Sequence, residues 1–245
     1  MTLANQFAAY TEWRTKLSSA IGQFKSWLTD NELSDAQIDL RLTQLLERLR
    51  EDRLNVAFVA EFSRGKSELI NAIFFAEYGS RMLPSSAGRT TMCPTELLFD
   101  ANKPSSIELL PIQTRSSNSG VTEYKRFPDE WKVVGLNIDE PDAMQDALRH
   151  VSETTRVMPD EARRLGFEVG EGEIDLYRVS DDGLVEIPRW RHAVINFPHP
   201  LLKQGLVILD TPGLNAIGAE PELTLSLLPN AHAVLFILAA DTGVT

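Results

Sequence analysis

The chain of 245 residues is 43% hydrophobic, which suffices for one large domain, or for one domain with an appendage. Acidic residues outnumber basic ones by 35 to 24, giving a net charge of −11. This balance argues against nucleic-acid binding and leaves no polybasic surface for anionic lipid. The single Cys93 excludes a disulfide framework. With no signal peptide and no apolar run of roughly 18 residues, we expect a cytoplasmic protein.

The first part of the chain has the pattern of two helices. Apolar residues recur at steps of three and four through residues 3–28. Ser34, with Gln37 three positions on, predicts a capping box that opens a second helix. We therefore expect a helical hairpin over residues 1–53. Its apolar stripes either pack against the domain that follows or pair with helices beyond residue 245 as a stalk or neck.

From residue 54 the pattern becomes α/β, and we take residues 54–245 as one domain with a mostly parallel sheet. The expected strands and helices are 54–59, 68–76, 206–209, 222–228 and 234–239.

A long insert, residues 100–193, separates these elements. Its flank and interior predict a hairpin of 96–99 with 106–112, a helical pair around 141–164, and strands 174–179 and 184–187 joined by an Asp-Asp-Gly turn. Residues 188–192 place Trp190 between two arginines. The acidic surroundings argue against a nucleic-acid contact, so we interpret this segment as a strand edge or loop.

Residues 56–60 have the pattern of an apolar strand. The same stretch, 56–67, ends in Gly65-Lys66-Ser67, and a helical pattern follows. This is the context of a phosphate-binding loop, in which backbone N–H groups at a helix N-terminus hold the phosphates. Lys66 is expected to contact the β- and γ-phosphates, and the Ser67 hydroxyl is expected to ligate Mg²⁺.

A second apolar strand ends in Asp-Thr-Pro-Gly at 210–213, which would bring Asp210 near Mg²⁺ and Gly213 near the γ-phosphate. Either motif alone is compatible with ordinary turn chemistry. Both motifs after strands in one chain predict a nucleoside-triphosphate site. One departure is Ala60, where the loop pattern requires glycine. Its methyl group is tolerated if the local φ is negative and otherwise weakens binding or turnover.

Four segments resemble bacterial dynamin-like GTPases: Glu-Phe-Ser-Arg-Gly-Lys-Ser at 61–67, a first switch with Gly-Arg-Thr-Thr at 88–91, a second switch at 201–215 and the strand end at 239–241. The resemblance covers residues 54–99 and 194–241 closely, residues 1–53 loosely, and the insert by no motif. It implies the G domain of a P-loop NTPase.

The resemblance also implies roles for individual residues. Thr91, or less favourably Thr90, would ligate Mg²⁺ and orient the attacking water. Ser63 would hold charge near the β–γ bridge, and Arg64 is either a cation for the transition state or a solvent-facing side chain. The implied nucleotide set is Ala60, Glu61, Phe62, Ser63, Arg64, Gly65, Lys66, Ser67, Asp210 and Gly213, and the implied metal ligands are Ser67, Thr91 and Asp210.

The family implies Mg²⁺-dependent hydrolysis of GTP to GDP, self-association through G domains, and peripheral contact with the inner face of a membrane through segments beyond residue 245. Phe62 stands where eukaryotic dynamins have glutamine, and Leu214 and Asn215 supply no glutamine after Gly213. A nucleotide-bound scaffold with negligible turnover is therefore the alternative. An ATPase of another P-loop branch also stays open, because the guanine-reading motif is not among these residues and we expect the chain to be a fragment.

Overall fold

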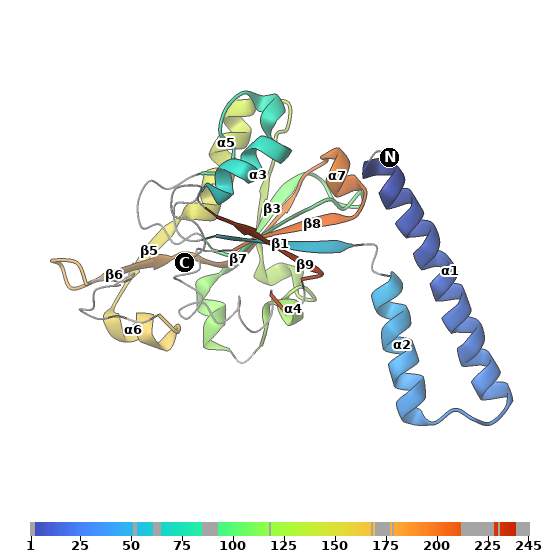
Figure 1. Ribbon diagram of the computed structural model, residues 1–245. Coiled ribbons are helices and arrows are strands. Elements are labelled where there is room, and N and C mark those ends of the chain that lie inside the picture. Colours follow the sequence, from blue (N-terminus) through green and yellow to red (C-terminus); the bar gives the residue numbers. More distant parts are fainter. Residues whose placement is uncertain are drawn as a thin grey trace. The chain divides into compact units, whose positions relative to one another are not determined.

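The computed structural model describes residues 3–50, 53–60, 65–84, 93–117, 119–167, 169, 177, 179–211, 228–229 and 231–238 (Figure 1). The chain divides into two compact units, Met1–Arg53 and Leu54–Thr245.

The first unit is a hairpin of two helices, α1 (Leu3–Asp30) and α2 (Ala36–Arg50), which lie side by side (Figure 1). Lys25 joins them, because its Nζ donates to the Thr43 hydroxyl at 2.7 Å and pairs with Asp39 at 3.0 Å. The predicted helical hairpin is confirmed. On the apolar stripe of α1, Trp13 and Phe24 are 54% and 50% exposed.

The cap of α2 differs by one residue from the prediction. The Asp35 carboxylate accepts hydrogen bonds from the N–H groups of Gln37 at 2.8 Å and Ile38 at 2.7 Å. Asp35 therefore satisfies the first-turn donors, and the prediction of Ser34 as the cap was wrong. A carboxylate at this end also interacts favourably with the helix dipole, which a hydroxyl group does to a much smaller degree.

The second unit is built on a sheet whose described strands follow the order β4-β3-β7-β2-β8-β1-β9. They are β1 (Leu54–Ala60), β2 (Thr95–Leu98), β3 (Ser106–Pro111), β4 (Lys132–Gly135), β7 (Trp190–Asn196), β8 (Leu206–Asp210) and β9 (Ala233–Ile237). Strands β8, β1 and β9 are parallel, and β2 is parallel to β7. The predicted α/β fold is confirmed. Antiparallel pairs join β2 to β8 and β3 to its two neighbours.

The predicted hairpin of 96–99 with 106–112 is wrong, because β7 lies between β2 and β3 and pairs with both. Asn196, at the end of β7, fills the loop that joins β2 to β3. Its Nδ2 donates to the carbonyl oxygens of Asp100, Lys103 and Pro104, and its Oδ1 accepts from the Asp100 N–H at 2.7 Å. This one side chain therefore holds the loop that connects β2 to β3 past the end of β7, the strand between them.

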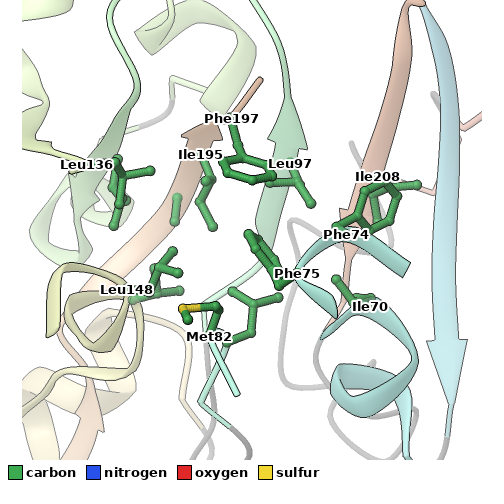
Figure 2. Packing of buried hydrophobic residues seen from close by; sticks show 14 of the residues in the cluster. Ile70, Phe74, Phe75, Met82, Leu97, Leu136, Leu148, Ile195, Phe197 and Ile208 are labelled. Atoms are coloured by element: carbon green, nitrogen blue, oxygen red, sulfur yellow. The ribbon is translucent and has the colours of Figure 1, made fainter. Parts of the chain in front are cut away.

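Helices cover both faces of the sheet. Helices α3 (Lys66–Phe74) and α5 (Pro141–Arg149) lie on one face, and α4 (Val121–Tyr124) lies on the other (Figure 1). Figure 2 shows the core on the first face, where Ile70 and Phe74 of α3 lie beside Ile208 of the sheet. Leu97 and Ile195 belong to the same cluster. Successive residues of a strand alternate between faces. Accordingly Val207 and Leu209 pack in a second cluster on the α4 face.

The insert adds a small two-stranded sheet of β5 (Thr154–Val157) and β6 (Val185–Pro188), with α6 (Pro159–Arg164). The predicted helical pair is present as α5 and α6, with β5 between them. The predicted Asp-Asp-Gly turn is also present, since the Ser180 N–H donates to the Leu184 carbonyl at 2.8 Å and Gly183 has φ +80°. Further short elements are η1 (Ala76–Tyr78), η2 (Ile112–Ser116), η3 (Pro128–Glu130), η4 (His150–Ser152) and α7 (Pro200–Lys203).

The segment 188–192 is not a strand edge or loop as predicted. Pro188 ends β6, and Trp190 begins β7, which is buried along its whole length inside the large sheet. The guanidinium of Arg191 donates to the Thr114 carbonyl at 2.9 Å and lies 5.7 Å from the ring centroid of Tyr124. These contacts neutralise the cost of burying an arginine in a strand. The predicted helix over 222–228 falls almost wholly outside the described residues.

Candidate nucleotide-binding site

Strand β1 ends at Ala60, and Gly65 precedes the first turn of α3. Gly65 has φ +80° and ψ +13°, a left-handed conformation that L side chains rarely adopt. Among the described residues, no atom lies within 4 Å of a Cβ atom placed on Gly65. The backbone conformation by itself favours glycine at this position. The left-handed turn leads directly into the N-terminus of α3, where Lys66 and Ser67 are the first residues of the helix.

Ala60 is the last residue of β1, is 1% exposed, and pairs with Ile237 of β9. Glu32 is the only non-glycine residue with positive φ in the described part of the chain, so the φ of Ala60 is ordinary. The absence of the pattern's first glycine therefore leaves the described end of the strand unstrained.

The structure brings Lys66 and Asp210 together, although 144 residues separate them in sequence. The Lys66 ammonium group donates to the Asp210 carboxylate and to the Thr211 carbonyl oxygen. The two charged side chains are only 14% and 8% exposed. Positive and negative charge thus meet at the carboxyl ends of two neighbouring parallel strands, where ligands bind in open α/β sheets.

Hydrogen bonds and strand pairing fix the position of Asp210. In register, Asp210 lies opposite Phe58 of β1 and Thr95 of β2. The next residue, Thr211, donates its hydroxyl to the Phe58 carbonyl at 2.8 Å and so fastens the end of β8 to β1. Sequence reasoning did not assign this role to Thr211; the signal available was a hydroxyl residue directly after a buried strand.

The structure also shows a buried amide that sequence reasoning missed. Asn71 of α3 is buried, accepts from the N–H groups of Met82 at 3.1 Å and Leu83 at 2.8 Å, and donates to the Leu83 carbonyl at 3.0 Å. Its signal in the sequence is a polar residue beside Ile70 on the apolar face of a helix. The remaining predicted site residues lie outside the described residues: Glu61, Phe62, Ser63, Arg64, Thr90, Thr91 and Gly213.

This arrangement defines a class of protein. A left-handed glycine and a lysine at the start of a helix, next to a strand-end aspartate, match the pattern of the phosphate-binding half of a P-loop nucleotide-binding domain. The Dynamin family model matches residues 56–245. The chain therefore belongs to the dynamin family, and its second unit has the fold of the family's G domain.

Several known proteins are similar to parts of this chain. A bacterial dynamin-like protein of Nostoc punctiforme is 24% identical over 204 residues, which cover 83% of this chain and 23% of that protein. The isoniazid-induced protein IniA of Mycobacterium tuberculosis is 40% identical over 73 residues, 26% of this chain and 11% of that protein. A solved chain of an oligomerised bacterial dynamin pair has a TM-score of 0.42 and 21% identity, covering 82% of this chain and 23% of that one. This chain thus spans less than a quarter of the length of each of these relatives.

In the described part of the chain, no helix is both long and apolar enough to span a membrane. Within the same residues, no group of three or more His, Cys, Asp or Glu side chains is placed to hold a metal ion.

Proposed function

We propose that this protein binds GTP with Mg²⁺ and hydrolyses it to GDP. The observation that supports this proposal is the meeting of Lys66 with Asp210 at the end of β8, next to the left-handed Gly65, in a chain of the dynamin family. When a nucleotide binds, the Lys66 ammonium group can exchange its contact with the Asp210 carboxylate for contacts with β- and γ-phosphate oxygens.

The donor set fits Mg²⁺. The hydroxyl of Ser67, in the first turn of α3, and the carboxylate of Asp210 are oxygen ligands of the kind that Mg²⁺ prefers, together with phosphate oxygens and water. Thr91 is proposed as a further ligand. When bound, the metal neutralises charge on the phosphates. Asp210 is buried and is held in position by Lys66.

The remaining roles are proposals from the family pattern. The backbone N–H groups of residues 60–67 would hold the phosphates, Ser63 would hold charge near the bridging oxygen, and Arg64 would stabilise charge on the transferred phosphoryl group. Thr91 would orient the attacking water through its carbonyl oxygen. Gly213 would donate its N–H to the γ-phosphate.

We also propose that hydrolysis is stimulated when two G domains pair across their nucleotides, and that the protein is cytoplasmic and contacts the inner membrane face peripherally. Family membership supports both proposals. The helical unit Met1–Arg53 is proposed as a neck or stalk element, with packing on the G domain as the alternative. The apolar stripe of α1, with Trp13 and Phe24, calls for a partner surface in either arrangement.

The test of the nucleotide site is the variant Lys66→Ala in the full-length protein. Fluorescent GTP should bind the parent and not this variant, because the variant lacks the charge aimed at the phosphates. Lys103→Ala is the matched control, since Lys103 pairs with Glu108 at 2.5 Å on the surface. Equal binding of GTP by Lys66→Ala and the parent would overturn the site, and competition by unlabelled ATP as strong as that by GTP would overturn the choice of guanine.

The second candidate is a nucleotide-bound scaffold with negligible turnover. Phe62 in place of glutamine and the absence of glutamine after Gly213 favour it. Ala60 no longer does, because its φ is ordinary for an L residue. Single-turnover hydrolysis of radiolabelled GTP separates the candidates: phosphate release above the rate of the Lys66→Ala variant supports the enzyme, and release at that rate supports the scaffold.

A further inference from the structure

One part of the insert contacts both sides of the segment 85–92, which carries Thr91. We call residues 141–152, comprising α5 and η4, the bracket. On the N-terminal side, Nε2 of Gln145 donates to the Arg81 carbonyl oxygen at 2.5 Å. Met144 and Leu148 of the bracket are fully buried in the cluster that also contains Met82, as Figure 2 shows for Leu148 and Met82.

The bracket also holds the C-terminal side of that segment. The Cys93 thiol donates to the Val151 carbonyl oxygen at 3.6 Å, and both residues are buried. Thr95 donates its hydroxyl to the Cys93 carbonyl at 3.0 Å. Thr95 also lies opposite Asp210 in register, so this flank is tied to β8, the strand that carries Asp210.

The bracket is itself fastened to the large sheet. Nε1 of Trp190 in β7 donates to the His150 carbonyl at 2.7 Å, and the Arg189 N–H donates to the Glu153 carbonyl at 2.9 Å. A buried indole N–H that has its partner restricts the turn to one position. The bracket therefore connects both flanks to the large sheet and holds them in a fixed position relative to it.

Helix α3 grips the N-terminal flank from the nucleotide side. Asn71 makes three hydrogen bonds to the backbone of Met82 and Leu83, and it lies one turn after Ser67 on the same helix. Residues 81–83 are thus held between the helix that carries Lys66 and the bracket of the insert. Buried hydrogen bonds of this kind fix a backbone closely, because an unpaired buried group is costly.

We propose that the bracket is a positioning element for GTP hydrolysis, which sets the flanks of the segment with Thr91 relative to α3. The inference rests on the proposed function. Small misplacements of a catalytic group reduce a rate strongly, whereas ground-state binding tolerates them. Breaking the contacts of the bracket with these flanks should therefore lower turnover much more than nucleotide affinity. A bracket that serves only as core packing would instead change stability and leave the turnover of the folded protein unaltered.

The sharpest variant is Gln145→Glu, which exchanges one amide nitrogen for oxygen and so removes the donor to the Arg81 carbonyl at constant size. Gln145 is half-buried, so the variant should fold. Asp146→Asn is the matched control, because it makes the reverse exchange at the next residue, whose carboxylate contacts Arg149 at 2.8 Å. Gln145→Lys offers a cationic donor to the same carbonyl and serves as the rescue. Asn71→Ala tests the grip from α3 and is expected to lower stability as well.

The measurements are single-turnover GTP hydrolysis, GDP affinity, the gain in GDP affinity on adding aluminium fluoride, and the thermal midpoint, all on the full-length protein. For Gln145→Glu we expect a loss of about threefold to tenfold in turnover and a comparable loss of the aluminium-fluoride gain, which mimics the transition state. GDP affinity should stay within about twofold, and Gln145→Lys should recover part of the loss. Asp146→Asn should match the parent in every measurement.

The outcomes distinguish a failure of the proposed function from a failure of this inference alone. No GTP hydrolysis by the parent protein would overturn the proposed function and this inference with it. Hydrolysis by the parent with unchanged turnover in Gln145→Glu would overturn the inference alone. A common fall in turnover and thermal midpoint for Gln145→Glu and Asp146→Asn would also overturn it, by showing a structural role for the helix as a whole.

Discussion

Lys66 and Asp210 form a buried ion pair that links the two strand ends of the site. Burying two charges has a desolvation penalty, which their contact offsets only when further hydrogen bonds complete it. The additional bond from Lys66 to the Thr211 carbonyl provides that completion. The pair also keeps both groups close to the place where phosphate and Mg²⁺ are proposed to bind.

At Ala60 we expect that the Gly variant is less stable by about 0.5–1 kcal/mol, because glycine gains backbone entropy in the unfolded chain. GTP affinity should change by less than about twofold, since the φ of Ala60 is already ordinary. Ala57→Gly is the control, being buried earlier in the same strand. Urea unfolding and fluorescent-GTP titration check both; a large gain in affinity for Ala60→Gly alone would show that the methyl group crowds the loop.

For Thr91 we expect that the Ala variant binds GTP within about threefold of the parent but hydrolyses it at least about tenfold more slowly. Ser67 and Asp210 would still anchor Mg²⁺, whereas the attacking water would lose its orientation. Thr90→Ala is the matched comparison and should have the milder effect. Single-turnover hydrolysis measures both, and a loss confined to Thr90→Ala would reverse the assignment.

At the scale of single elements, α2 depends on its cap. Asp35→Ala should lower the stability of the helical unit by about 1 kcal/mol, because two first-turn N–H groups lose their acceptor. Ser34→Ala should have almost no effect. Thermal unfolding of the two variants, followed by circular dichroism, distinguishes the two caps. A larger loss of stability for Ser34→Ala than for Asp35→Ala would show that Ser34 is the cap.

Strands β2 and β7 are joined by a buried polar network on the α4 face of the sheet. Lys125 donates to both carboxylate oxygens of Glu96, at 2.6 and 2.8 Å, and Nε2 of His192 lies 3.0 Å from Oε1. Burial alone would raise the pKa of Glu96, but the hydrogen bonds and charges of His192 and Lys125 outweigh it and lower the pKa from 4.5 to about 2. The carboxylate is thus held ionised inside the fold.

The lowered pKa of Glu96 predicts an acid-sensitive contribution to stability. The contribution is fully present above about pH 4.5, the value of the unfolded chain, and is lost as pH falls toward 2. The shift corresponds to a free energy on the order of 3 kcal/mol. Glu96→Gln should therefore be less stable than the parent at pH 7, and the gap should narrow between pH 4.5 and 2. Urea unfolding at a series of pH values measures the difference in the free energy of unfolding between Glu96→Gln and the parent. Glu123→Gln is the control, because Glu123 of α4 is exposed. A difference that stays constant with pH would contradict the network.

At the scale of the whole molecule, the proposed pairing of G domains predicts that GTP turnover per molecule rises with protein concentration, because a pair forms only by association. Steady-state turnover of the full-length protein over a hundredfold range of concentration, about 0.1 to 10 μM, checks this, together with the mass of the GTP-bound species in solution. Turnover per molecule that stays constant over this range would argue that each G domain acts alone.

The sequence by itself determined the local features of this protein. A glycine before a helix, an apolar strand before an aspartate and helical periodicity each depend on near neighbours. The glycine before α3, the end of β8 and the helical hairpin were therefore predictable. The nearness of Lys66 and Asp210 was also predictable, because the carboxyl ends of adjacent parallel strands meet at one edge of a sheet.

Only the tertiary structure decided which strands pair and which polar residues are buried. Three features of this kind are the place of β7 between β2 and β3, the hydrogen bonds of Asn71 and the network around Glu96. Each joins segments that are far apart in the sequence, and other segments could have paired at the same positions. Strand hydrogen bonds are alike at every position, so their pairing depends on side-chain packing across the whole sheet. Local sequence signals cannot rank such pairings, and the folded chain does so by burying β7 along its whole length and satisfying its polar groups.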